Sequence, residues 1–230
     1  MSNYAYVATR ARSRRSRLLP AEAYNQLLNL EHAEIARYIQ DLEYRREIDR
    51  YGSTLSGADL IETALVDNLA KDVGDFLSFS KGKLRDILHV YAEKYRIENL
   101  KNIVRGINQN MDKQNLERLV CPINDSDKEL YNKLYDSKTV EDMISSLEGT
   151  SYYNPLKKAL EARNSDSLQP LEDALDLIYY QNLVSNQPSG GADVEVYRDF
   201  VQLKVDIANI KTLLRMRHRS IGAHDELLIG

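Results

Sequence analysis

The residues that could carry acid–base, metal or nucleophilic chemistry are few and far apart in this sequence. The histidines occur without the H-E-x-x-H or paired-cysteine spacing that holds a metal ion. No G-x-S-x-G sequence provides a serine nucleophile, and Cys121 lacks a nearby basic partner that would activate its thiol. We therefore predict no catalytic residue and no metal site. The four histidines are interpreted as surface or helix-cap residues: His32, His89, His218 and His224.

Glycine and lysine occur together at Gly82-Lys83, which invites comparison with a phosphate-binding loop. That motif needs glycines in register and a hydroxyl after the lysine, whereas Leu84 follows here and Gly74 lies too far upstream. We predict a helix-connecting loop, no cofactor and no small-molecule substrate. Carboxylates are numerous, but on amphipathic helices a run of charges is usually a solvated face. An enzyme with a dispersed acid–base site remains an alternative, which turnover dependent on particular carboxylates would reveal.

A more informative feature is a polar motif that occurs twice. A shift of 110 residues places Asn99, Lys101 and Arg105 on a second set of identical residues, with apolar residues matched between them. Earlier in the unit the shift slips to 107, as expected when loops absorb insertions. We predict two tandem helical domains, residues 1–110 and 111–230. The matched pairs include Asn99 with Asn209, Lys101 with Lys211, Arg105 with Arg215, Leu100 with Ile210, Ile103 with Leu213, Val104 with Leu214, Glu62 with Glu172, and Tyr24 with Tyr131.

The repeated cations have two interpretations. Lysine and arginine in register on successive domains would line a polar face toward a protein partner, because charged rims steer partners and fix their register. Alternatively, Asn99 and Asn209 bind neighbouring backbone, and the lysines are ordinary exposed helix positions. The candidate partner-binding residues are Lys101, Arg105, Lys211 and Arg215.

Helices must position these residues, because apolar residues recur every three to four positions along the chain. One such stripe contains Ile61, Leu65, Leu69 and Leu77. The 230 residues include only ten Gly and five Pro, which favours long elements. No segment alternates as a strand does, so we predict an all-α fold with more than about 60 % helix. Prolines are expected near helix ends or in loops, and the clearest loops are residues 49–57, 108–127, 149–155 and 185–193.

Composition and charge exclude several classes of protein. Residues 1–17 contain five arginines and no acidic residue, although the whole chain has a net charge of −4. Such a start superficially resembles a transit peptide or a nucleic-acid arm, but we favour a first helix with its arginines mostly on the wet side. No periodic basic run follows, which argues against a nucleic-acid partner. No stretch approaches 18 consecutive apolar residues, and the single Cys121 cannot form an internal disulfide.

Two segments resemble a known family. The opening Tyr4-Ala5-Tyr6-Val7 with Arg10-Ala11-Arg12, and the run ENLKNIVR at residues 98–105, are similar to the C subunit of archaeal and bacterial A/V-type ATP synthases. The similar run ANIKTLLR at residues 208–215 fits the repeats of that family, whose eukaryotic relative is the d subunit of the vacuolar ATPase. The resemblance covers essentially the whole chain. It implies a funnel-like, all-helical, non-catalytic subunit of the central rotor.

The same resemblance implies partners and a location. The partners would be the central-stalk subunits and the membrane proteolipid ring, and the protein would lie peripherally on the cytoplasmic side of the cell membrane. There it would couple ion flow to ATP synthesis or hydrolysis. The runner-up function is an all-helical scaffold that binds a partner helix or peptide in a concave groove. Co-purification with stalk and ring subunits separates the two functions.

The chain departs from the family in length. That family typically has three repeats, and two are found here, so a third repeat is expected to be missing. We therefore expect the final Leu227-Leu228-Ile229 to be exposed and to promote self-association, since uncapped ends of repeat arrays are apolar.

Overall fold

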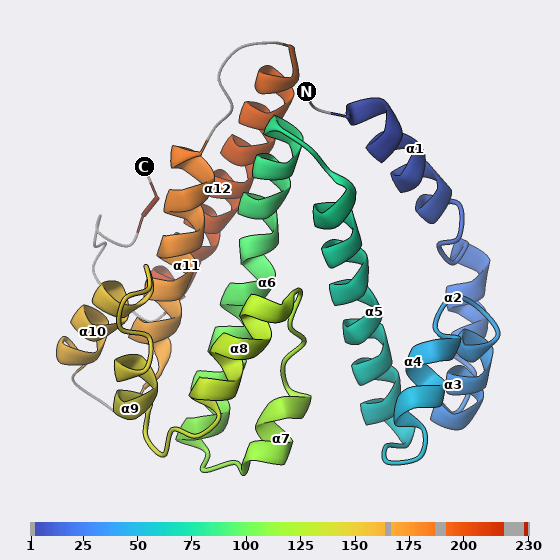
Figure 1. Ribbon diagram of the computed structural model, residues 1–230, viewed down its shortest axis with the longest axis horizontal. Coiled ribbons are helices and arrows are strands. Elements are labelled where there is room, and N and C mark those ends of the chain that lie inside the picture. Colours follow the sequence, from blue (N-terminus) through green and yellow to red (C-terminus); the bar gives the residue numbers. More distant parts are fainter. Residues whose placement is uncertain (1–2, 164–166, 187–191, 219–227, 230) are drawn as a thin grey trace. The chain divides into compact units, whose positions relative to one another are not determined.

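The computed structural model describes residues 3–163, 167–186, 192–218 and 228–229, and this described part consists of helices and their connections (Figure 1). Helices account for 75 % of it and it contains no β-strand, which confirms the predicted all-α fold. Packing divides the helices into two compact units. Unit 1 comprises residues 1–85 and 121–125, and unit 2 comprises residues 86–120 and 126–230.

Unit 1 is organised around one long helix, α5 (Gly57–Phe79), against which α3 (His32–Gln40) and α4 (Arg45–Tyr51) pack. The chain reaches them through α1 (Tyr4–Arg15) and α2 (Ala21–Leu27). The core of unit 1 is small, and two of its five buried members are alanines. These members are Ala36, Ile39, Ile48, Leu60 and Ala64.

Arginine side chains of α1 form ion pairs and cation–π contacts with α5. The guanidinium of Arg14 lies 2.6 Å from a carboxylate oxygen of Asp72 and 2.6 Å from one of Asp75, and it also lies over the ring of Phe76. Arg10 lies over a neighbouring aromatic ring in the same way. The predicted first helix is therefore confirmed. The other arginines of residues 1–17 are exposed, as expected for its wet side.

The predicted apolar stripe lies on α5, where its Leu77 is buried and its Ile61 packs against the core, but its middle residues are exposed. Leu60 and Ala64 are buried, whereas Leu65 and Leu69 of the stripe are 40 % and 44 % exposed. Apolar residues surround much of this helix, so periodicity locates the helix without deciding which side faces the core.

Unit 2 begins within α6 (Lys83–Asn108), a continuous helix of 26 residues. Its second half is buried, whereas its first turns are mostly exposed or half-buried. Four shorter helices follow: α7 (Lys113–Arg118), α8 (Asp125–Leu134), α9 (Val140–Ser145) and α10 (Tyr153–Glu161).

Two long helices, α11 (Gln169–Ser185) and α12 (Ala192–His218), complete unit 2 and lie beside α6 in Figure 1. α10 packs on both α9 and α11, and α11 contacts α12. One continuous apolar core joins these elements to α6. Its fully buried members include Ile97, Leu100, Ile103, Leu134, Met143, Leu147, Leu156, Leu171, Leu175 and Leu183.

The order of the helices supports our proposal of two tandem domains. Shifted by 110 residues, α6 falls on residues 193–218, where α12 lies, and α5 falls on residues 167–189, where α11 lies. Shifted by 107 residues, α3 and α4 fall where α9 and α10 lie. Within the described residues, α1 to α6 and α7 to α12 therefore follow the same order. The tandem repeat, its boundary at residue 110 and the funnel-like body stay predictions.

The longest predicted loop, residues 108–127, contains a helix. Asp112 is the N-cap of α7, and its carboxylate accepts a hydrogen bond from the backbone N–H of Asn115 at 2.8 Å. Such a cap satisfies one of the free N–H groups at a helix start. The loop predicted at residues 149–155 is also shorter, because α10 begins at Tyr153. Pro188 lies outside the described residues. The prolines at described positions lie near helix starts or in loops, as predicted: Pro20, Pro122, Pro155 and Pro170.

Candidate partner-binding surface

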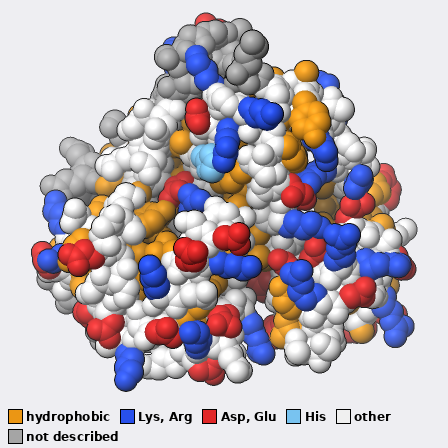
Figure 2. All heavy atoms as spheres, in the orientation of Figure 1, with side chains coloured by type: hydrophobic (Ala, Val, Ile, Leu, Met, Phe, Trp, Pro, Cys, Tyr) orange, Lys and Arg blue, Asp and Glu red, His pale blue; other side chains and the backbone are white. Residues whose placement is uncertain are grey.

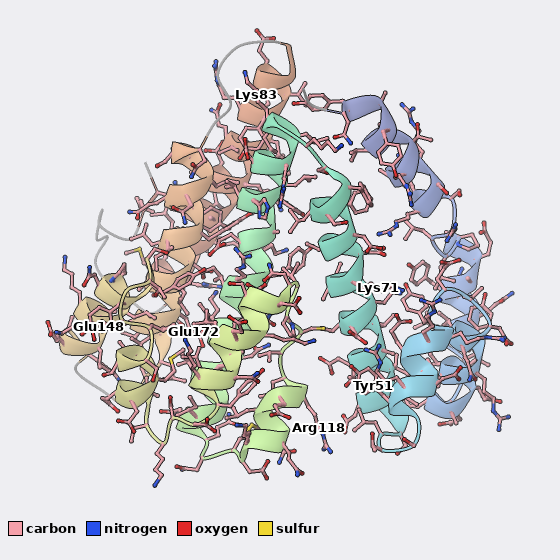
Figure 3. The ribbon with its side chains drawn as sticks, in the orientation of Figure 1. Tyr51, Lys71, Lys83, Arg118, Glu148 and Glu172 are labelled. Atoms are coloured by element: carbon pink, nitrogen blue, oxygen red, sulfur yellow. The ribbon has the colours of Figure 1, made fainter. Side chains whose placement is uncertain are left out.

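Two of the predicted partner-binding residues, Lys101 and Arg105, tie α6 to α11 within unit 2. The Nζ atom of Lys101 lies 2.5 Å from Oδ1 of Asp176, and Lys101 is only 6 % exposed. Arg105 donates from Nε and Nη2 to the two carboxylate oxygens of Glu172, at 2.7 and 2.8 Å. Figure 3 shows Glu172 on α11, beside α6. Both cations therefore have a carboxylate partner inside their own unit.

The pKa values of the acidic residues in this ion-pair cluster depend on cations from two helices, α6 and α12. Hydrogen bonds from Arg105 hold the pKa of Glu172 below its ordinary value, although burial acts in the opposite direction. Burial raises the pKa of Asp173, opposed by a hydrogen bond from Nε2 of Gln169 at 2.7 Å. Arg215 of α12 lowers the pKa of both carboxyl groups through its charge. The charge of Arg215 on α12 therefore acts on two carboxyl groups of α11.

The Glu172–Arg105 pair predicts a pH-dependent contribution to stability. Because the pKa of Glu172 is lowered in the folded state, its contribution is complete above the unfolded pKa of about 4.3 and disappears as pH falls through the folded pKa. We expect Glu172→Gln to lower the free energy of unfolding by about 1–2 kcal/mol at pH 7, since the bond is charge-assisted and partly exposed. Urea unfolding at pH 7 and pH 3 measures this difference, which should shrink at pH 3. Glu161→Gln, at an exposed position of α10, is the control; an equal loss at both pH values would contradict the prediction.

The other two predicted residues, Lys211 and Arg215, lie exposed on α12. Neither forms an ion pair with any residue that the structure describes. The structure thus pairs one half of the predicted set internally and leaves the other half at the surface. A role of the four cations in binding a partner stays a prediction.

The two repeated asparagines make different contacts. Asn209 donates from Nδ2 to the carbonyl of Ile229 at 2.8 Å and accepts from the Ile229 N–H at 2.9 Å, which is the backbone-binding role. Asn99 donates to the hydroxyl of Tyr131 at 3.4 Å. Leu228 and Ile229 are partly buried, so the exposed chain end that we expected is not found at these two residues. Leu227 lies outside the described residues.

A buried polar network in unit 2 was not predicted from the sequence. Arg96 of α6 donates from Nε to Asp127 of α8 at 2.7 Å and forms an ion pair with Glu93 at 3.0 Å. The hydroxyl of Tyr152, at the start of α10, donates to Glu93. Burial raises the pKa of this hydroxyl, and the Glu93 charge adds to the effect. The spacing of Glu93 and Arg96 was visible in the sequence, but their partners on other helices were not.

The described residues that could do chemistry are arranged for structure. Burial, together with Asp67, raises the pKa of Cys121 to about 12, so the thiol stays protonated at neutral pH. Its sulfur lies 3.5 Å from an Asp67 oxygen. Gly82 has a φ of 57° between α5 and α6, which is the predicted connecting loop. Across the described part of the chain, no group of three or more His, Cys, Asp or Glu side chains could hold a metal ion.

The visible surface carries charges of both signs. On the face drawn in Figure 2, Lys and Arg side chains are interspersed with Asp and Glu, and hydrophobic side chains show between them. Among the described residues, no helix combines the length and the apolar character needed to cross a bilayer.

The fold and its charged clusters thus define a class: an all-helical protein in which ion pairs join neighbouring helices. The chain belongs to the ATP synthase (C/AC39) subunit family, whose model matches residues 7–228. Relatives named as the C subunit of A-type ATP synthase include one from Archaeoglobus fulgidus, 35 % identical over 93 % of this chain and 61 % of its own length. Those of Haloferax volcanii and Methanosarcina acetivorans are 35 % and 33 % identical, over 94 % and 99 % of this chain and 62 % of their own lengths. The chain therefore spans about three fifths of these relatives.

Proposed function

We propose that this ATP synthase subunit is a non-catalytic part of the central rotor. It would couple the soluble stalk to the membrane proteolipid ring during ion-driven ATP synthesis or hydrolysis. The observation that carries the proposal is the family match over residues 7–228, together with relatives named as the C subunit of A-type ATP synthase. On this proposal the protein lies peripherally on the cytoplasmic side of the membrane.

The packing of unit 2 suits a part that transmits torque. A coupling protein must resist twisting, and close-packed helical cores resist it because side chains would have to rearrange. α6 crosses the core with Ile97, Leu100, Ile103 and Val104 at most 1 % exposed. The ion pairs of Lys101 and Arg105 add directional links between α6 and α11. These features support a stiff body, which the proposed role requires.

The seat for the stalk is proposed to be polar and to include the four repeated cations. Lys211 and Arg215 are directly accessible on α12, whereas Lys101 and Arg105 would act mainly by holding α11 in place. Charged groups at an interface rim mainly affect the rate of association and its salt dependence. Lys211 and Arg215 are therefore the positions at which binding can be tested without disturbing the core.

Binding of purified stalk subunits to the chain of residues 1–230 tests the proposal. We expect Lys211→Glu with Arg215→Glu to weaken binding by about tenfold at low salt, with helicity and melting temperature nearly unchanged. Arg198→Glu with Arg217→Glu, two exposed positions on the same helix, changes net charge equally and serves as the control. Failure of the wild-type chain to bind stalk subunits would refute the proposed role. Equal weakening by both double variants would show a general charge effect and would exclude a seat at Lys211 and Arg215.

A further inference from the structure

The buried face of α6 shows what the repeated motif does when a partner helix covers it. Ile97, Leu100, Ile103 and Val104 are 0–1 % exposed in the core of unit 2. Beside them, Lys101 binds Asp176 and Arg105 binds Glu172 on α11. The cation nearer the end of α6 binds the carboxylate nearer the start of α11, so the two helices pair in antiparallel order.

The equivalent face of α12 has the same chemistry but is open. At a shift of 110 residues, the four apolar residues become Ile207, Ile210, Leu213 and Leu214, which are 41–61 % exposed. Lys211 and Arg215 take the positions of Lys101 and Arg105, and both are exposed. Six positions therefore have the same type of side chain on both helices, but they are packed against other helices on α6 and exposed on α12.

The first half of α12 is packed in the core of unit 2, so the open positions belong to a helix that is docked in its own unit. Tyr197 and Val201 of α12 are buried in the core of unit 2, and α12 contacts α11. The ring of Phe200 lies 5.9 Å from that of Tyr91 on α6. Exposed apolar faces beside polar groups commonly mark sites of protein interaction.

We propose that this face of α12 docks a helix of a partner polypeptide that carries two carboxylates four residues apart beside an apolar stripe. By analogy with α6 and α11, the partner helix runs antiparallel to α12, with its first carboxylate on Arg215 and its second on Lys211. A Glu-x-x-x-Asp spacing, as at Glu172 and Asp176, meets this requirement. The inference rests on the geometry of the α6–α11 pair; it concerns the same two cations as the proposed stalk seat, but it does not require the coupling role.

A second copy of the chain is the main competing occupant. Along α12, apolar residues recur in steps of four and three, and Asp206 precedes Lys211 by five residues. A parallel α12 pair could therefore join Asp206 to Lys211 of the partner copy, as in a coiled coil. Such a dimer supplies an intermolecular carboxylate to Lys211 alone, whereas an acidic helix supplies one to each of the two cations. The observations thus favour the acidic helix.

A peptide with the sequence of residues 168–186 of this chain is the probe, because it carries Glu172, Asp176 and the apolar face of α11. The chain of residues 1–230 is titrated into the labelled peptide at low salt, and fluorescence anisotropy is measured. The peptide should not displace α11 from α6, because α11 is tethered to the same chain and therefore has a high effective concentration. We expect saturable binding, weakened about tenfold by Lys211→Ala with Arg215→Ala and equally by a peptide with Glu172→Gln and Asp176→Asn. A photocrosslinker on the peptide should attach to α12.

Three results would overturn the inference. The first is no saturable binding at protein concentrations up to about 1 mM. The second is binding that is indifferent to the Lys211 and Arg215 changes, or crosslinking to α6 alone. The third is a dimer, seen by analytical ultracentrifugation, that saturating peptide does not dissociate. Circular dichroism of each variant verifies the fold. Because stalk subunits are absent from this experiment, its failure is distinct from failure of the proposed function.

Discussion

Arg96→Ala is expected to lower the free energy of unfolding of the protein by about 3–5 kcal/mol, since removing one member of a buried ion pair leaves uncompensated charge. Arg96 lies between Asp127 and Glu93, and Asp127 is buried. The substitution also removes the side chain that links α6 to α8. The loss should therefore weaken the whole of unit 2.

Urea unfolding followed by circular dichroism measures this effect. Arg118→Ala on α7 is the matched control, because Arg118 is exposed, and it should change stability by less than about 0.5 kcal/mol. Arg96→Lys keeps the charge but loses the second hydrogen bond, so its effect should be intermediate. A stability change for Arg96→Ala as small as that of the control would show that the network does not contribute to folding.

Lys101→Glu should also cost about 3–5 kcal/mol, because it places a buried carboxylate against Asp176 and near Glu98. Lys101→Met should cost much less, because Asp176 is 40 % exposed and water can solvate it. The control is Lys211→Glu, the same substitution at the equivalent position of α12. Since Lys211 is exposed, its stability should change by less than about 0.5 kcal/mol.

This pair of variants distinguishes the two interpretations of the repeated cations. If Lys101→Glu unfolds unit 2 while Lys211→Glu folds normally, the first cation is structural and the second is available to a partner. If Lys101→Glu leaves the melting temperature unchanged, the ion pair with Asp176 is not important for the fold. Thermal melting at neutral pH separates these outcomes.

The helices were predictable from the sequence because apolar periodicity is a local property. The repeat at a shift of 110 also identified Asn99, Lys101 and Arg105 together. The carboxylates that hold these cations were not predictable, because Asp176 lies 75 residues from Lys101 and is brought near only by packing. Whether a repeated cation faces solvent or a carboxylate depends on which helix covers it.

The face that each helix buries was harder to predict than the helix itself. Leu65 and Leu69 belong to a regular stripe on α5, yet both are exposed, while Ala64 is fully buried. Where apolar residues occupy more than one side, the neighbouring helices decide which side becomes core. The short helix α7 was missed for a different reason: Asp112 caps it within a segment whose composition indicates a loop.

The direct test of the coupling role compares ATP hydrolysis with ion translocation. A-type ATP synthase complexes reconstituted into vesicles are prepared with and without the chain of residues 1–230, and both rates are measured in the same sample. We predict that removing the chain abolishes ATP-driven ion translocation while hydrolysis by the soluble part continues, and that adding the chain back restores translocation. Ion translocation at an unchanged ratio to hydrolysis in complexes that lack the chain would contradict the proposed coupling role.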